Sequence, residues 1–208
     1  VYKRQYKYNS KNIGEVEFKN QYIDTHTDLI INLPLVDADL IRSRNFKVVV
    51  DAVNSTGGIA VPNLLNKLGV EVIKLYCDPN GEFPHNPEPL KENLTDLSKL
   101  VIKEKADFGI VVDPDVDRLA FVSENGEVFG EEYTLIACAD YFLKNNPGIT
   151  VSNLSSSRAL RDITESYGCE YFSSAVGEVN VVEKMKEKNA VIGGEGNGGI
   201  ILPELHYG

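Results

Sequence analysis

Short apolar segments rich in β-branched residues alternate with amphipathic segments along most of this 208-residue chain. The first kind of segment predicts buried strands, and the second predicts helices. Strands that are separated by helices pair in parallel, because the connecting helix must cross one face of the sheet. The sequence therefore predicts the α/β class, with two consecutive three-layer α/β units whose mixed sheets are mainly parallel.

A polar break at Asn145-Asn146-Pro147-Gly148 divides this alternation into two runs. Clusters of asparagine, proline and glycine end helices and mark linkers between domains. We expect a leading segment at residues 1–19, a first unit at 20–146 and a second unit at 147–208. The second run is short and stops directly after an apolar segment, so we expect the chain to be cut from a longer protein.

The clearest chemical signal is a set of alternating acids at the end of a predicted strand. The apolar segment Phe108–Val112 runs directly into Asp113, Asp115 and Asp117. Residues at i, i+2 and i+4 of an extended or gently curled segment project to one side. Crowded carboxylates repel each other, and a hard divalent cation such as Mg²⁺ removes that repulsion through oxygen ligation. Arg118 adds a fixed positive charge suited to phosphate. The loop therefore predicts a Mg²⁺ site for a phosphoryl group, with a polar turn as the plain alternative.

Other types of protein also carry acids in such a loop. An EF-hand needs glycine at the sixth position and helices on both sides, whereas this chain has Arg118 there and strand-like flanks. We reject the EF-hand. An aspartyl phosphatase, with Asp113 as nucleophile and Asp115 as acid, stays open, although a downstream Gly-Asp-x-x-x-Asp motif is missing. A non-catalytic scaffold domain with a structural metal also stays open.

A glycine-rich motif, Gly193-Gly194-Glu195-Gly196-Asn197-Gly198-Gly199, follows the last predicted strand. Its glycines fit the dinucleotide-binding pattern, but that pattern requires a helix next, and Ile200-Ile201-Leu202-Pro203 is strand-like. We reject a nucleotide site. The side-chain oxygens of Glu195 and Asn197 accept hydrogen bonds from hydroxyl groups, which suits a sugar. A tight turn with incidental polar residues is the alternative.

Together the two motifs resemble the metal-binding and sugar-binding loops of the α-D-phosphohexomutases, the phosphoglucomutase and phosphomannomutase family. They occur in the family's order and at about its spacing, and the resemblance runs from about residue 20 to the end of the chain. It implies an intramolecular phosphotransferase that interconverts the 1- and 6-phosphates of a hexose, glucose or mannose, through a phosphoserine and Mg²⁺. It also implies that the chain contains the second and most of the third of four domains.

The resemblance implies that Asp113, Asp115 and Asp117 are ligands of Mg²⁺. It implies that Glu195, Asn197 and Gly198 contact the sugar, and that Arg118 supports the phosphate or the loop. Two family features are missing. The phosphoserine loop reads Ser-His-Asn-Pro, but Pro84 precedes the His-Asn-Pro of this chain. A basic residue that often precedes a Val-Gly pair is missing before Val176. We therefore expect domains I and IV of the parent chain as partners, and a chain that alone binds Mg²⁺ weakly without turnover.

Other residues have less specific interpretations. His85 lies in a proline-rich loop, where it could act as an acid or base or stabilise its own turn, and we favour the structural role. His206 lies just past the glycine-rich motif and could reach a substrate. The run Ser155-Ser156-Ser157-Arg158 begins a predicted helix and is interpreted as its N-cap.

Charge and cysteine content restrict the class of protein. A formal charge of −10 argues against non-specific nucleic-acid binding, which needs clustered basic residues. Apolar runs as long as a membrane span are missing, and residues 1–6 lack the apolar core of a signal peptide. Cys77, Cys138 and Cys169 are odd in number and far apart, which predicts buried reduced thiols and a cytoplasmic location.

Overall fold

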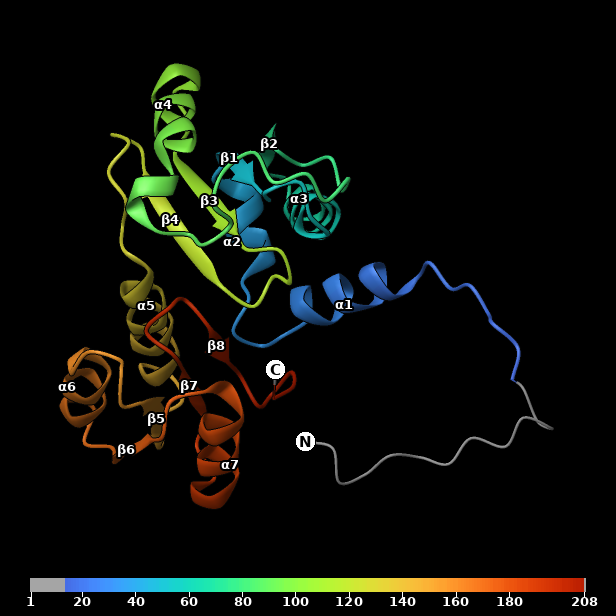
Figure 1. Ribbon diagram of the computed structural model, residues 1–208. Helices are drawn as coiled ribbons and strands as arrows, with labels where there is room; N and C mark the ends of the chain where they lie inside the picture. The colour runs from blue at the N-terminus through green and yellow to red at the C-terminus, as the bar shows by residue number, and fades with distance from the viewer. Residues whose placement is uncertain (1–13, 208) are drawn as a thin grey trace.

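The computed structural model describes residues 14–207, so most of the predicted leading segment lies outside the described residues. Within that range the chain forms two units, each built on a four-stranded sheet (Figure 1). Each sheet has three parallel strands and one antiparallel strand. The prediction of an α/β fold with two mainly parallel mixed sheets is confirmed.

The first unit contains four strands: β1 (Lys47–Asp51), β2 (Glu71–Leu75), β3 (Phe108–Val112) and β4 (Leu119–Ser123). Its α-helices are α1 (Tyr22–Ile31), α2 (Ala38–Ser43), α3 (Gly57–Lys67) and α4 (Thr95–Glu104), with a 3₁₀ turn at Lys91–Asn93. The strand order is β2-β1-β3-β4, and β4 is the antiparallel strand.

The second unit contains β5 (Thr150–Asn153), β6 (Tyr171–Ser174), β7 (Ile192–Gly194) and β8 (Ile200–Ile201). Its helices are α5 (Glu131–Leu143), α6 (Ala159–Ser166) and α7 (Glu178–Lys188). The strand order is β6-β5-β7-β8, with β8 antiparallel. This order repeats that of the first unit, strand for strand.

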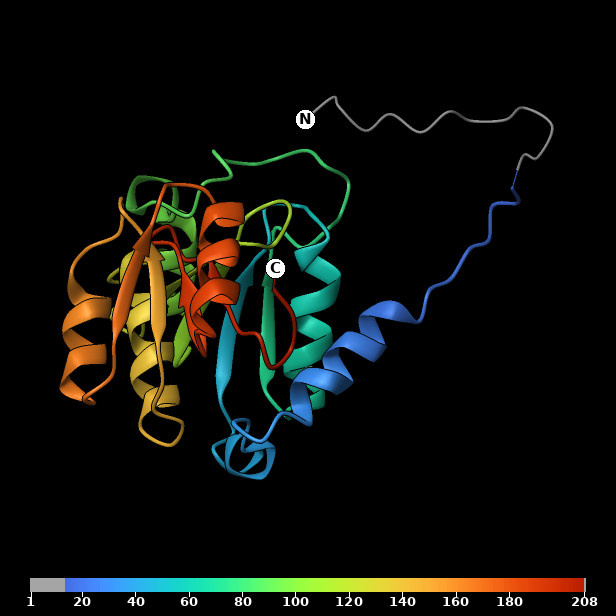
Figure 2. The same cartoon turned by 90° about the horizontal axis from the view of Figure 1, so that it is seen from below.

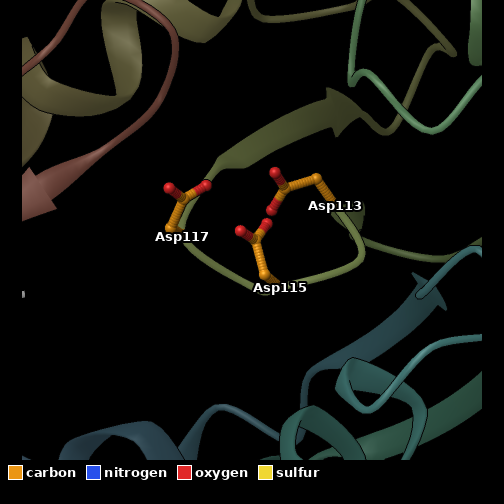
Figure 3. A group of neighbouring side chains, drawn as sticks. All are labelled: Asp113, Asp115 and Asp117. Atoms are coloured by element: carbon orange, nitrogen blue, oxygen red, sulfur yellow. The ribbon is translucent and has the colours of Figure 1, made fainter. Parts of the chain in front are cut away.

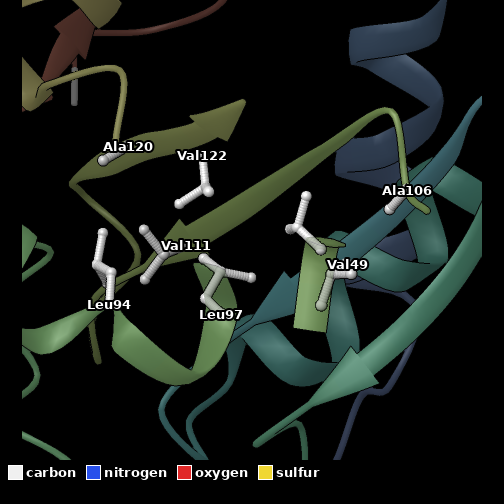
Figure 4. Packing of buried hydrophobic residues seen from close by; sticks show 8 residues of the cluster. Val49, Leu94, Leu97, Ala106, Val111, Ala120 and Val122 are labelled. Atoms are coloured by element: carbon white, nitrogen blue, oxygen red, sulfur yellow. The ribbon is translucent and has the colours of Figure 1, made fainter. Parts of the chain in front are cut away.

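Helices cover both faces of each sheet. In β1, Val49 belongs to one buried cluster with Leu97 of α4 (Figure 4), which also contains Val101 of that helix. Val48 and Val50 belong to the cluster on the opposite face, with side chains of α1, α2 and α3. This division follows from the alternation of strand side chains between two faces. Each fully buried aliphatic side chain stabilises the fold by about 1.5–3 kcal/mol relative to an exposed one. In the second unit, α5 and α6 cover one face and α7 covers the other.

Helix α5 contacts both units. Its Leu135 and Ala139 pack with Leu160 and Ile192 of the second unit, and the Thr134 hydroxyl donates a hydrogen bond to the Leu119 carbonyl oxygen at 2.9 Å. The division predicted after residue 146 assigns α5 to the first unit and stays a prediction.

Helix α3 begins earlier than the sequence indicates. The sequence predicts a helix over Pro62–Leu68, because proline is favoured in the first turn of a helix. The helix instead begins at Gly57 and continues through Pro62. A Cβ at Gly58 would lie 2.4 Å from the Cys77 carbonyl oxygen, and one at Gly57 would lie 2.6 Å from a methyl group of Val112. The two glycines therefore let the start of the helix pack directly on the sheet, which offsets the hydrogen bond lost at Pro62.

The parallel strands of both sheets end at the same edge of the molecule, which is the upper edge in Figure 2. Ligands of open α/β sheets bind outside the carboxyl ends of the strands. The loops at this edge are therefore candidates for a ligand-binding site.

None of the helices in residues 14–207 combines the length and the apolar character that a membrane span requires. Cys77, Cys138 and Cys169 are free and partly buried. The cytoplasmic location stays a prediction.

Candidate active site

The structure brings the three predicted acids together in the loop between β3 and β4. One carboxylate oxygen from each of Asp113, Asp115 and Asp117 lies within 4.8 Å of the other two. Asp113 and Asp115 point toward each other inside the loop, and the Asp117 carboxylate lies at its side (Figure 3). Asp113 is buried, whereas Asp115 and Asp117 are exposed, so a cation held here would be reached from the solvent side.

Local backbone geometry curls this loop. The Arg118 N–H donates to Asp113 Oδ1 at 3.0 Å, and the Val116 N–H donates to the Asp113 carbonyl oxygen at 3.1 Å. Val116 has a φ of 64°, in the left-handed region that β-branched residues rarely adopt. The surrounding structure must stabilise this conformation; Val116 packs in the same cluster as Val112.

The electrostatics of the loop favour a divalent cation. Burial, together with the charges of Asp117 and Asp115, raises the pKa of Asp113 to about 6, although the hydrogen bond from the Arg118 N–H acts in the opposite direction. Three oxygen donors that repel each other are the ligand set that Mg²⁺ or Ca²⁺ binds in proteins. The residues of this loop therefore fit a hard divalent metal ion.

Arg118 lies among carboxylates. Its Nη1 is 3.2 Å from Glu88 Oε1, and its Nε is 3.7 Å from Asp113 Oδ2 and 3.8 Å from Asp117 Oδ1. The side chain thus lies against the acid loop, and its role in supporting the loop or a phosphate stays a prediction. Sequence reasoning missed Glu88, which reaches Arg118 from the proline-rich loop thirty positions earlier.

The glycine-rich loop joins β7 to β8 and is held by its own polar groups. The Glu195 N–H donates to the Gly199 carbonyl oxygen at 2.9 Å, and the Gly199 N–H donates to Asn197 Oδ1 at 3.1 Å. The Asn197 amide donates to Glu195 Oε2 at 3.4 Å. The two predicted sugar acceptors are therefore neighbours on one turn.

The acid loop and the glycine-rich loop are in direct contact. The Leu119 N–H, at the end of the acid loop, donates to the Gly198 carbonyl oxygen at 3.2 Å. A Cβ at Gly198 would lie 2.4 Å from the Leu119 carbonyl oxygen, and the φ of Gly198 is 94°. Glycine is thus required for this close approach. Each loop joins the third strand of its unit to the antiparallel fourth strand, so the two loops occupy equivalent positions.

A cavity of about 280 Å³ lies between the two loops. Its lining includes Asp115 and Asp117 from the first unit and Glu195 and Asn197 from the second. His206 lines the same cavity, and its ring centroid lies 5.7 Å from that of His26. Two of the three candidate metal ligands therefore share one cavity with the candidate sugar acceptors.

A second cavity, of about 470 Å³, lies beside the first. Its lining includes these charged or polar side chains: Glu88, Arg118, Glu131, Glu132, Asn153 and Glu195. Among the described residues that line it, Arg118 is the one basic residue. Val176 and Gly177 also line it, so the basic side chain that the family often has before this pair is missing at the wall of the cavity.

His85 lies apart from the residues that line these cavities. Its Nε2 is 3.0 Å from Oδ2 of Asp51, which is 1% exposed, and its Nδ1 is 2.7 Å from the Asn86 carbonyl oxygen. A carbonyl oxygen only accepts, so Nδ1 carries a proton and Nε2 shares one proton with Asp51. This pair anchors the proline-rich loop to the end of β1, which agrees with the structural role that we favoured.

Comparison with known proteins identifies the two units. The phosphoglucomutase/phosphomannomutase α/β/α domain II model matches residues 20–126, and the domain III model matches residues 130–208. The chain is 37% identical over 198 residues to a phosphoglucomutase/phosphomannomutase of Thermococcus kodakarensis, covering 94% of this chain and 43% of the relative. It is 35% identical to a probable phosphoglucosamine mutase of Methanopyrus kandleri, covering 93% and 42%.

Solved structures agree with these relatives. A putative phosphomannomutase from Thermus thermophilus superposes with a TM-score of 0.83 at 25% identity, covering 93% of this chain and 45% of that one. A phosphoglucomutase/phosphomannomutase family protein from Burkholderia thailandensis superposes with a TM-score of 0.73 at 30% identity, covering 83% and 40%. The chain thus spans less than half the length of each of these proteins. Both matched family models and both sheets point to one conclusion: the chain belongs to the phosphoglucomutase/phosphomannomutase family and contains its second and third α/β/α domains.

Proposed function

We propose that the protein to which this chain belongs interconverts hexose 1-phosphate and hexose 6-phosphate, with glucose or mannose as the sugar. The observation that carries the proposal is the contact between the two loops, because it lines one cavity with both carboxylates for a metal and acceptors for a sugar. Transfer of a phosphoryl group to or from a sugar uses a metal site and a sugar site in one cavity.

The residues of the two loops have distinct roles in this proposal. Asp113, Asp115 and Asp117 hold Mg²⁺, which when bound neutralises charge on a phosphoryl group during transfer. Glu195 and Asn197 accept hydrogen bonds from sugar hydroxyls and orient the ring, and the backbone of Gly198 keeps the two loops in contact. Arg118 supports the acid loop and offers its guanidinium group to phosphate.

The phosphoserine that donates the phosphoryl group lies outside this chain in our proposal. The sequence supports this, because His85-Asn86-Pro87 follows a proline, which has no hydroxyl group. The structure supports it as well, because the His85 ring is hydrogen-bonded to Asp51. The domains that supply the phosphoserine and the grip on the substrate's phosphate are the remaining partners. Alone, the chain binds Mg²⁺ and sugar phosphate without turnover.

Binding of glucose 1-phosphate to the chain in the presence of Mg²⁺ tests the proposal. We expect saturable, millimolar binding in an NMR titration, and about tenfold weaker binding for Glu195→Gln, because an amide replaces one carboxylate acceptor. Glu165→Gln, an exposed glutamate on α6, is the matched control and should bind like the wild type. A wild-type chain that shows no shifts at the glycine-rich loop with any hexose phosphate would refute the sugar-binding role.

Glu88 gives a second prediction at this site. Its carboxylate contacts the guanidinium edge of Arg118 that a phosphate would use. Glu88→Gln removes one negative charge, so we expect the affinity for glucose 1-phosphate to rise about three- to tenfold at low salt and by less at high salt. Calorimetric titration at two salt concentrations, with Glu92→Gln on the same segment as control, measures this. Weaker binding by Glu88→Gln would mean that Glu88 orients Arg118 for the phosphate instead of competing with it.

A further inference from the structure

Asn153 is a buried polar residue that the proposed reaction does not yet use. It is the last residue of β5, a central strand of the second sheet, and is 3% exposed. It lies at the carboxyl end of the strand and lines the larger cavity together with Glu195. Buried side-chain amides are retained where their hydrogen bonds are satisfied, so its partners indicate its role.

Three donors fix which way the Asn153 amide faces. Its Oδ1 accepts hydrogen bonds from the Ser155 hydroxyl at 3.0 Å, from the Ser156 N–H at 3.0 Å and from the Ser156 hydroxyl at 2.7 Å. A backbone N–H can only donate, so the atom that faces these serines must be the oxygen. The amide nitrogen therefore faces the glycine-rich loop.

That nitrogen forms a hydrogen bond with Glu195. Asn153 Nδ2 donates to Glu195 Oε1 at 2.5 Å, and the Gly177 N–H, just before α7, donates to the same oxygen at 3.1 Å. Glu195 Oε1 is thus occupied by two donors from the protein. Glu195 Oε2 has the Asn197 amide at 3.4 Å, and this oxygen retains capacity for a ligand hydroxyl.

The same network also holds the backbone of the glycine-rich loop. The Ser156 hydroxyl donates to Asn153 and accepts a hydrogen bond from the Gly196 N–H at 2.9 Å. The interpretation of the serine run as an N-cap is wrong, because the N-cap position of α6 is Arg158, which forms no side-chain cap hydrogen bond. Ser155 and Ser156 contact Asn153 instead. Both the side chain of Glu195 and the backbone next to it are connected to the end of β5.

We propose that Asn153 is a positioning residue for sugar recognition: it holds Glu195 Oε1 so that Oε2 is the oxygen presented to a substrate hydroxyl. This inference rests on the proposed function, in which Glu195 binds the sugar. Asn153 contacts Glu195 and the two serines, and acts on the substrate only through Glu195.

A double-mutant cycle tests this role. We expect Asn153→Ala to weaken glucose 1-phosphate binding about tenfold, as Glu195→Gln does, while Mg²⁺ affinity stays unchanged because the acid loop belongs to the other unit. If Asn153 acts through Glu195, the double variant should bind no more weakly than Glu195→Gln alone. Additive losses, or wild-type affinity in Asn153→Ala, would overturn the proposal. Asn146→Ala, an exposed asparagine, is the control.

Two further measurements separate positioning from a loss of stability. Asn153→Asp keeps the shape of the side chain but places a carboxylate against Glu195, so we expect weaker binding than in Asn153→Ala. Hydrogen exchange reports on the network without ligand: the Gly177 amide should exchange at least tenfold faster in Asn153→Ala, because Glu195 Oε1 is no longer held, while amides of β1 are unaffected. Unchanged exchange at Gly177 would overturn the positioning role. A wild-type chain that binds no sugar phosphate would refute the proposed function. In that case the rate of hydrogen exchange at Gly177 would still decide whether Asn153 holds Glu195.

Discussion

Replacing Asp113 by asparagine should stabilise the metal-free chain at neutral pH and at the same time abolish its response to Mg²⁺. The pKa of Asp113 is raised to about 6 by burial and by the neighbouring acids. A carboxyl group whose pKa is higher in the folded state keeps its proton there while the unfolded chain has released it, so stability falls as pH rises from about 4 to about 6. Above about pH 6 the folded chain holds an unfavourable buried charge, which asparagine lacks.

The size of this effect follows from the pKa. Each unit by which a pKa is displaced corresponds to about 1.4 kcal/mol, so we expect Asp113→Asn to raise the free energy of unfolding by about 1–3 kcal/mol at pH 7 in the presence of a chelator. Asparagine retains an acceptor for the Arg118 N–H. Without Asp113 the loop loses a ligand, and Mg²⁺ affinity should fall at least about 100-fold.

Urea denaturation with and without Mg²⁺ measures both effects. The wild type should gain stability on addition of Mg²⁺ and Asp113→Asn should not, because ligand binding to the folded state alone stabilises it. Asp162→Asn, an exposed acid paired with Arg158 on α6, should match the wild type under both conditions. Equal stabilisation of wild type and Asp113→Asn by Mg²⁺ would exclude the acid loop as the metal site.

The second large effect is expected at His85, which lies outside the cavities. His85→Ala leaves Oδ2 of Asp51, a side chain that is 1% exposed, without its hydrogen-bond partner. Removing one member of a buried, hydrogen-bonded pair costs about 3 kcal/mol, because the remaining polar group stays desolvated. We therefore expect a loss of that size in the free energy of unfolding, and release of the proline-rich loop that carries Glu88.

The pH dependence of His85→Ala has a defined sign. Burial raises the pKa of Asp51, and the hydrogen bond from Val53 and the interaction with His85 lower it. Without His85 the pKa of Asp51 rises further, so the stability of the variant relative to the wild type should fall as the pH rises through the range in which Asp51 ionises. His26→Ala, an exposed histidine, should change stability by less than about 0.5 kcal/mol. A His85→Ala chain as stable as wild type at high pH would mean that Asp51 has found another donor.

Much of the fold could be predicted because its signals are local. The valines of β1 and β3 and the periodicity of α4 are properties of short segments, and the acids at Asp113, Asp115 and Asp117 converge because alternate residues of a curled loop share one side. Both site motifs were found for the same reason: each is contiguous in the sequence.

The rest of the site depends on contacts between segments that are distant in the sequence. Glu88 meets Arg118 thirty positions later, and Asn153 meets Glu195 forty-two positions later. Periodicity and spacing carry no information about such pairs. One usable signal for Asn153 is its place at the end of Thr150–Asn153, which the alternation of segments predicts as a strand. Ligands of α/β proteins bind outside the carboxyl ends of such strands. The predicted start of α3 at Pro62 was wrong for the same reason, because the close packing of Gly57 on Val112 is also a tertiary contact.

The matching strand order of the two sheets has a consequence for how such a site can change. Each loop stands on a pair of strand ends whose position is fixed by apolar packing deeper in its own unit. Substitutions within a loop can therefore alter its chemistry while the scaffold beneath it keeps its shape. The two loops thus lie at equivalent positions on two sheets of the same strand order, one rich in acids and the other in glycines. The sequence of either loop can change without a change in the sheet that carries it.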